Sequence, residues 1–316
     1  MERDLTFRSK SPEFPEYYLG DPKKRYFSNK YRDVNHTLKN IVIENGAITS
    51  TFDIMWPDVW QEKKGATINP HISTFDLFLI STRLVELFFS NVLGKQYGEL
   101  CRLWVSEVSC KVGSQMPCGT KNKCTCSVIE EDNSSYTFKI TIEKVIMFLR
   151  IEKPKNSENS LPFIVADNNS YFENDYKLAE RGITKISIND TEKTLNAYYN
   201  IKHNESVKYN GLSSYFMPCL TYCDLFLTGG QLSQILLFCV NKTTREDVSN
   251  LWLRSMKSRC ESRIMESVSG PVSVIIKNTS VLNVKNDVFH CADVEVDFNN
   301  GMLKAEWKAA YNSISI

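Results

Sequence analysis

The chain of 316 residues is 42% hydrophobic and 24% charged, and its 38 lysines and arginines against 37 aspartates and glutamates leave a net charge of +1. This length allows two domains with cores of their own, and the charge balance gives no reason to expect a nucleic-acid partner. Charged residues interrupt the apolar segments 75–89 and 220–240, and no hydrophobic export signal follows Met1. We therefore expect a cytoplasmic protein without a membrane partner.

The first half of the chain predicts two short strands, one long helix and two longer strands, in that order. Asn45-Gly46 lies between the apolar-polar alternations of 41–43 and 47–56, which is typical of a hairpin. After a loop, apolar spacing predicts a helix over about 74–93, and Gly94 is a good C-terminal stop. Strands are expected over 102–112 and 136–150.

The second half predicts the same order of elements. The expected segments are two short strands, a helix and three strands, over 183–188, 195–201, 222–240, 250–257, 272–277 and 291–298. Because the stretch 156–159 is polar and typical of a loop, we place the boundary there and predict domains over 1–155 and 156–316.

An internal repeat supports this division. The tract 70–79 (PHISTFDLFL) returns as 218–227 (PCLTYCDLFL), 148 residues later, with five of ten positions identical. In the same register, Leu103-Trp104-Val105 falls on Leu251-Trp252-Leu253. A period this long indicates a duplicated domain, because solenoid repeats are much shorter. A long helix among several strands predicts the α+β class, and by analogy a tandem (double) hot-dog fold, in which each repeat wraps an antiparallel sheet around a central helix.

The ten cysteines do not predict a metal site. Cys110, Cys118, Cys124 and Cys126 are the densest group, but they contain no CxxC pair, which structural zinc sites usually show. We expect a reduced loop there, with no assigned role. The chain has no Walker A loop, no dinucleotide-binding glycine motif and no serine-hydrolase elbow, so no cofactor is predicted.

Both copies of the repeat place a hydroxyl residue three positions before an aspartate, as Ser73-x-x-Asp76 and Thr221-x-x-Asp224. This is the signature of a capping box, in which side chains satisfy the free N–H groups at a helix start. The same helix N-terminus could instead stabilise the oxyanion of a reacting thioester, with Ser73 and Thr74 beside the substrate. The sequence leaves open whether Asp76 and Asp224 cap helices or take part in catalysis.

His71 is a candidate general acid or base. It lies just before the predicted helix start, and the second copy has Cys219 in its place, so only one copy offers a group that titrates near neutral pH. Packing in a loop is the alternative. Cys219 could be a nucleophile at a helix start, although its apolar neighbours favour a buried thiol. Trp60 and the Lys63-Lys64 pair precede the same loop. Such a pair is usually a solvated turn, but here the lysines could hold a phosphate, the hydroxyls of a sugar or the phosphopantetheine of a carrier protein.

Further tracts occur at Tyr18-Leu19-Gly20-Asp21, Lys24-Arg25-Tyr26-Phe27 and Tyr31-Arg32-Asp33-Val34. Together with Trp60, Lys63-Lys64 and Pro70-His71-Ile72-Ser73-Thr74-Phe75-Asp76, they resemble the avirulence D (AvrD) proteins of plant-associated and other bacteria. Ser28-Asn29-Lys30 departs from that family, in which glycines are expected. The resemblance implies a part in making acylated sugar-derived signals (syringolides), and His71, Asp76, Lys63 and Lys64 are the positions that carry over.

The resulting hypothesis is an enzyme that condenses a β-ketoacyl thioester, carried by an acyl carrier protein or coenzyme A, with a sugar-like hydroxy-ketone. His71 would be the base and the helix start near Thr74 would bind the oxyanion. Two alternatives stay open: a dehydratase or thioesterase in which His71 works with Asp224 across the repeats, and an acyl-binding protein without turnover. Monomer and homodimer also both stay open.

Overall fold

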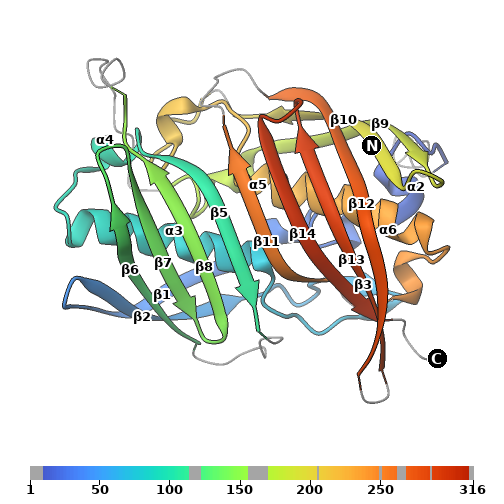
Figure 1. Cartoon of the computed structure of the whole chain (residues 1–316), viewed down its shortest axis with the longest axis horizontal. Helices are drawn as coiled ribbons and strands as arrows, with labels where there is room; N and C mark the ends of the chain where they lie inside the picture. Colours follow the sequence, from blue (N-terminus) through green and yellow to red (C-terminus); the bar gives the residue numbers. More distant parts are fainter. Residues whose placement is uncertain are drawn as a thin grey trace.

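The computed structural model describes residues 10–113, 122–155, 170–204, 206–248, 251–261, 268–284 and 287–312. Its largest element is one 12-stranded sheet, in which every pair of neighbouring strands is antiparallel. Two long helical segments lie against one face of this sheet (Figure 1). The expected α+β class is confirmed.

The elements of the first half follow the predicted order, with additions. They are α2 (Pro15–Leu19), η1 (Pro22–Lys24), η2 (Lys30–Asp33), β1 (Asn35–Glu44), β2 (Ala47–Met55), β3 (Glu62–Lys63), β4 (Ala66–Thr67), α3 (Thr74–Asn91), α4 (Tyr97–Leu100), β5 (Trp104–Val112), β6 (Asn122–Glu131), β7 (Ser135–Ile142) and β8 (Val145–Glu152).

The second half has a similar series. It comprises η4 (Asp175–Leu178), β9 (Glu180–Asn189), β10 (Thr194–Lys202), η5 (Ser214–Phe216), α5 (Tyr222–Asp224), the π-helical segment η6 (Leu225–Gly229), α6 (Gly230–Val240), η7 (Arg245–Asp247), β11 (Trp252–Cys260), β12 (Ser269–Val284), β13 (Asp287–Phe298) and β14 (Leu303–Asn312). The boundary expected at residue 155 adjoins residues 156–169, which lie outside the described ranges.

The strand order is the same when the sheet is read inward from either edge. The order is β1-β2-β6-β7-β8-β5-β11-β14-β13-β12-β10-β9. In each half, the two strands before the helix form the outer edge, and the first strand after the helix, β5 or β11, reaches the centre. Figure 1 shows β1 and β2 at one end of the molecule and β9 and β10 at the other.

The central pair β5–β11 is nearly symmetric in register. Ser109 pairs with Lys257, which lies 148 residues later, the same offset as the repeat in the sequence. On either side of this pair, Cys110 faces Met256 and Val108 faces Ser258. An approximate twofold axis through Ser109 and Lys257 would exchange these two flanking pairs.

The two outer strands carry the same irregularity. On β1, the register shifts between Lys39 and Val42, and Asn40 has a φ of 52°. On β9, the register shifts between the residues opposite Asn196 and Tyr198, and Lys185 has a φ of 57°. Each shift is a β-bulge, which inserts an extra residue and bends the strand.

The sequence predicts the starts of both long helices correctly. The capping boxes of Ser73 with Asp76 and of Thr221 with Asp224 are both formed, so the helices begin at Thr74 and Tyr222. The second helix is not uniformly α-helical, because η6 interrupts it. The helical stretch Tyr222–Val240 is long and apolar enough to cross a membrane by length and composition, but 83% of its most apolar window is buried inside the fold.

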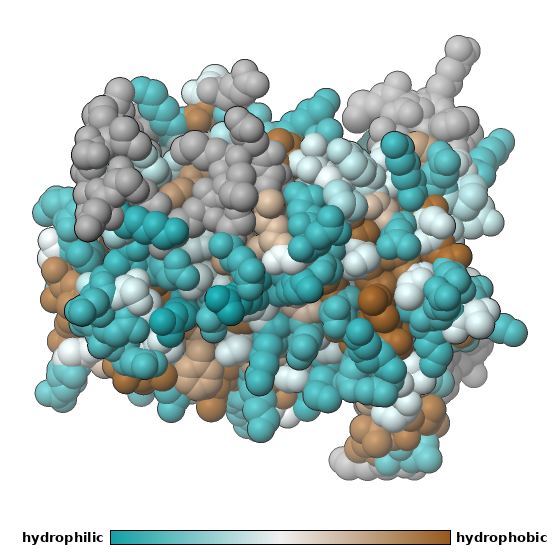
Figure 2. All heavy atoms as spheres, turned by 45° about the horizontal axis from the view of Figure 1, so that its top comes forward, coloured by the Kyte–Doolittle hydropathy of each residue, from teal (hydrophilic) through white to brown (hydrophobic). Residues whose placement is uncertain are grey.

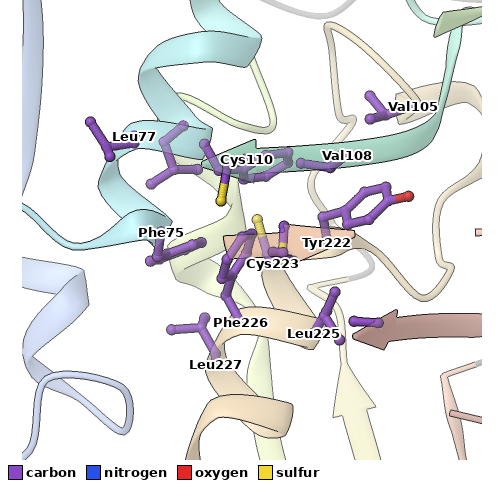
Figure 3. Close-up of a cluster of buried hydrophobic side chains, with 14 of the residues drawn as sticks. Phe75, Leu77, Val105, Val108, Cys110, Tyr222, Cys223, Leu225, Phe226 and Leu227 are labelled. Carbon is purple, nitrogen blue, oxygen red and sulfur yellow. The ribbon is translucent and has the colours of Figure 1, made fainter. Parts of the chain in front are cut away.

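The starts of the two helices meet in the core beside β5. The ring centroids of Phe75 and Phe226 lie 5.7 Å apart, and Phe78 lies within 5.7 Å of both Tyr222 and Phe226. Figure 3 shows this cluster with Val108 and Cys110 of β5 against it. Burial of these aromatic side chains is a large part of what holds the two halves together.

The surface is mixed in character. Polar side chains cover most of the face drawn in Figure 2, with apolar patches between them.

Three strand predictions were wrong or missing. The segment 136–150 is two strands, β7 and β8, joined at Glu143, which has a φ of 50°. The expected cysteine loop is strand β6, on which Cys124 and Cys126 are fully buried opposite β2, while Cys118 lies outside the described residues. Strand β14 was missed, although its alternate residues Leu303, Ala305 and Trp307 are buried.

Candidate functional site

A cavity of about 130 Å³ lies between the loop before α3, the helix α6 and the central strands of the second half. Its lining combines aromatic rings with polar and positively charged side chains. Trp60, Lys63, His71, Ser73 and Thr74, all selected from the sequence, line it. Tyr26, Arg25 and Arg245 also line it, whereas no aspartate or glutamate of the described residues does. The structure therefore brings five of the candidate residues together at one site.

Asp76 lies beneath this cavity, fully buried, at the centre of a hydrogen-bond network. Its Oδ1 accepts hydrogen bonds from the Tyr26 hydroxyl (2.6 Å) and from Nε2 of His36 (2.8 Å). Its Oδ2 accepts from the Ser73 amide (2.8 Å) and the Ser73 hydroxyl (2.6 Å). Tyr26 and Ser73 also line the cavity, so two hydroxyl groups connect the buried carboxylate to the space where a ligand would bind.

This network keeps Asp76 ionised. Burial by itself would raise the pKa of Asp76, but the hydrogen bond and charge of His36, with the hydrogen bonds of Ser73 and Tyr26, hold that pKa below its usual value. Because an ionised carboxylate can only accept hydrogen bonds, the proton between the two groups belongs to Nε2 of His36. In the neutral ring, Nδ1 then keeps its lone pair.

His36 was not predicted as a site residue, and a second repeat identifies it. The tract 26–36 (YFSNKYRDVNH) matches 171–181 (YFENDYKLAER) at an offset of 145 residues, with four identical positions. In this alignment, Tyr26 corresponds to Tyr171 and His36 to Arg181. The change of offset from 148 to 145 residues explains why a search without gaps does not find it.

In the second copy, an ion pair takes the place of the His36–Asp76 contact. Nε of Arg181 lies 2.7 Å from Oδ1 of Asp224, and the side chains are 6% and 0% exposed. The Thr221 amide and hydroxyl donate to Oδ2 of Asp224 at 2.7 and 2.8 Å. Burial would lower the pKa of Arg181, but the charge of Asp224 raises it. This copy therefore has a permanently charged partner where the first copy has a histidine.

His71 lies at the cavity but not against either aspartate. Its ring packs edge-on against Trp60, with centroids 4.7 Å apart. The hydrogen bonds of Asp76 go to Tyr26, His36 and Ser73, so Asp76 does not orient the His71 ring by a hydrogen bond. Asp224 is paired with Arg181, which does not support the alternative of a crossed His71–Asp224 pair.

Burial makes His71 neutral near pH 7. Desolvation lowers the pKa of His71 from 6.5 to about 4, with the charge of Asp76 opposing this shift and that of Lys63 adding to it. Since the folded pKa lies below the unfolded one, the unfolded chain binds this proton first on acidification. We expect the free energy of unfolding to fall between about pH 6.5 and pH 4, and the fall to be smaller in His71→Gln. Urea titrations at a series of pH values would measure this, and an identical pH dependence in both proteins would contradict it.

The neighbouring residues Lys63 and Lys64 lie in different surroundings. Lys63 is buried, its Nζ donates to the Val248 carbonyl at 3.0 Å, and burial with the charge of Arg245 lowers its pKa to about 8. Lys64 is exposed, has a φ of 49° and lies 3.5 Å from Asp247 through its Nζ, outside the cavity lining. The prediction that Lys64 binds substrate beside Lys63 is therefore corrected.

The cysteines of the site region are buried thiols, and at Cys219 this is the interpretation that its apolar neighbours favoured. Cys219 is fully buried, and burial raises the pKa of its thiol well above the usual value, so it does not provide a thiolate nucleophile. Burial likewise raises the pKa of Cys110 to about 12 and that of Cys124 to about 11. Among the described residues, no group of three or more His, Cys, Asp or Glu side chains is placed to hold a metal ion.

The fold and site define an α+β protein with a mixed polar and apolar cavity at a capped helix N-terminus. A family model described as Pseudomonas avirulence D protein (AvrD) matches residues 13–305, and the chain belongs to this family. No individually curated protein matches the sequence.

Solved structures show weaker likenesses. The tesB protein MAP1729c of Mycobacterium avium subs paratuberculosis is 10% identical with a TM-score of 0.45, covering 88% of this chain and 96% of its own. The acyl-CoA thioesterase II TesB2 of Mycobacterium marinum is 7% identical with a TM-score of 0.45, covering 88% and 97%. The 12:0-ACP thioesterase of Umbellularia californica is 9% identical with a TM-score of 0.41, covering 85% and 98%. These values are too low to carry a conclusion about this chain.

Proposed function

We propose that this protein is a cytoplasmic enzyme that acts on acyl thioesters and transfers a β-ketoacyl group to a sugar-like hydroxy-ketone, whose product then cyclises. One observation carries the proposal: a single cavity combines aromatic walls with His71, Ser73 and the start of α3. The aromatic walls suit an acyl chain and the polar groups suit its reacting end. Acyl carrier protein or coenzyme A would deliver the thioester.

The proposal includes a tandem hot-dog architecture. Three observations support it. The two halves have the same strand order, each half packs one helix on the same face of the sheet, and β5 and β11 pair in a nearly symmetric register. In such an arrangement, a ligand site lies where the two repeats meet. The cavity is lined from both halves, by Ser73 and Phe75 of the first and by Phe226 and Trp307 of the second.

The proposal gives each group a part in the reaction. Thr74 and Phe75 occupy the first turn of α3, whose N–H groups have no partner within a helix, so they are suited to stabilise the oxyanion formed at the thioester carbonyl. Neutral His71 would accept the proton of the attacking hydroxyl. The C–S bond then breaks, and the thiol leaves with that proton. Asp76, which is held by His36, would act through Tyr26 and Ser73, whose hydroxyls donate to it at the cavity.

The test is an assay with a purified β-ketoacyl thioester and a hydroxy-ketone, following thiol release and product mass. We expect His71→Ala to lose about 100-fold in rate, the usual scale for an acid–base group. The matched control is His290→Ala, because His290 stacks on Tyr311, with centroids 5.2 Å apart, and does not line the cavity. The control should turn over like the wild type.

The outcomes separate the alternatives. Thiol release without an acylated product would indicate a thioesterase, and loss of water from a hydroxyacyl thioester would indicate a dehydratase. Binding of the thioester without turnover would indicate an acyl-binding protein. Equal rates for His71→Ala and wild type would remove His71 from the mechanism.

A further inference from the structure

Three cations that come from separate segments are buried around the cavity. Arg25, Lys63 and Arg245 are 4%, 7% and 7% exposed, and all three line it. They follow η1, lie on β3 and begin η7, respectively, so tertiary folding brings them together. Burial lowers the pKa of both Arg25 and Lys63, and the charge of Arg245 lowers both further, so Arg245 lies near each of the other two. Burying like charges together is unfavourable without a counter-charge.

The described residues leave part of the hydrogen-bonding capacity of this cluster unused. Arg25 donates from Nη1 to Gln231 at 2.8 Å, but its buried Nε and Nη2 have no hydrogen-bond partner among the described residues. The nearest carboxylate, Glu16, is 3.8 Å from Nη2, beyond hydrogen-bonding distance. Arg245 pairs with Glu246 at 2.9 Å, and Glu246 is 44% exposed. Four carboxylates, Glu16, Asp21, Glu62 and Glu246, lie close enough to act on these charges, but none of them lines the cavity.

We propose that Arg25, Lys63 and Arg245 form a subsite for a phosphate ester within the cavity. This inference rests on the proposed function and names the substrate class more closely. A phosphate dianion offers more charge and more acceptor oxygens than a carboxylate, and its oxygens match the donor fork of a guanidinium such as that of Arg25, whose Nε and Nη2 are unpartnered among the described residues. The cost of desolvating the cations is met on folding, so a bound phosphate gains a preorganised site.

Two sources could supply the phosphate ester. It could belong to the phosphopantetheine arm of the acyl donor, or to a phosphorylated hydroxy-ketone acceptor. Matched pairs of probes distinguish them: 4′-phosphopantetheine with pantetheine for the first, and ribulose 5-phosphate with ribulose for the second. Each pair differs only by the phosphate group. Calorimetric titration of the full chain would give the four affinities.

Lys63→Met and Lys64→Met make a matched pair of variants. Both remove one positive charge and keep the aliphatic stem, but only Lys63 lines the cavity. We expect one phosphorylated probe to bind at least about tenfold more tightly than its unphosphorylated partner, which is the scale of a charge-assisted contact. Lys63→Met should abolish that difference, and Lys64→Met should preserve it. Melting temperatures would show whether each variant is folded.

Several results would overturn the subsite. Equal affinity within both probe pairs would do so, as would equal losses in the two lysine variants. Should Lys63→Met fail to fold, Arg25→Gln, which retains a donor toward Gln231, takes its place under the same criteria. The outcome is separable from that of the enzyme assay. Turnover without any phosphate preference refutes the subsite alone, and a phosphate preference without turnover refutes the proposed function alone.

Discussion

Asp224→Asn is expected to lower the free energy of unfolding by about 3–5 kcal/mol, the usual cost of removing one partner from a buried ion pair. The substitution leaves the Arg181 guanidinium inside the protein without its counter-charge, and this side chain is only 6% exposed. Arg181 also donates to the Tyr31 hydroxyl and the Tyr176 carbonyl, both at 3.0 Å, so it cannot turn to solvent without breaking contacts between the halves.

Chemical denaturation of the wild type and of three variants would measure this loss of stability. Asp76→Asn is the matched control, because an imidazole, unlike a guanidinium, carries no permanent charge, so a smaller loss is expected. The double variant Arg181→Met with Asp224→Asn should recover part of the loss, since it removes both charges. A loss of only about 0.5–1 kcal/mol in Asp224→Asn, the scale expected from weakening a helix cap alone, would contradict the role of the ion pair.

The largest effect on turnover is expected for Asp76→Asn, a loss between about 100-fold and 10,000-fold in kcat. Asp76 accepts four hydrogen bonds from three residues, and an amide can accept on only one of its two ends. If the oxygen of the new amide still accepts from Ser73, its nitrogen faces Nε2 of His36. Because that nitrogen can only donate, Nε2 must accept, and the proton of the His36 ring must lie on Nδ1. The network then loses both its negative charge and the free nitrogen of His36.

A structural role alone would not produce the expected pattern. Asp76→Asn and His36→Asn should lose similar factors in kcat with little change in KM, and the double variant should lose no more than either one, because the two groups act as a unit. Additive losses in kcat, or losses of stability with kcat unchanged, would contradict a shared role of the pair in turnover.

The sequence predicts the elements whose signals are local. The capping boxes at Ser73 and Thr221 fix the helix starts, because the hydroxyl and carboxylate that form them are three residues apart. Prediction from the sequence fails where the pattern of one kind of structure is interpreted as another. Cys124 and Cys126 alternate with polar residues as an inward-facing strand does, but interpreting cysteines as candidate metal ligands hides that pattern. The turn at Glu143 lacks the glycine or asparagine that would reveal it.

One part of the candidate site could also be predicted from local signals. His71, Ser73 and Thr74 share one short segment, and its repeat draws attention to them. The pairing of Asp76 with His36 depends on where β1 passes the start of α3, which no local pattern contains. The convergence of Arg25, Lys63 and Arg245 has the same origin, since one of them comes from beyond α6. Lys64 shows that adjacency in the sequence can also mislead. It follows Lys63 directly, but its side chain lies outside the cavity.

The bulges on β1 and β9 have a consequence for self-association. An open sheet has two unpaired edges, and a regular edge strand can template the addition of another chain. β1 would be a strong template, because Ile41, Val42 and Ile43 are 44–46% exposed on it. The kinks at Asn40 and Lys185 break the even spacing of backbone donors and acceptors on both edges, which disfavours extension of the sheet into a fibre by further copies of the molecule.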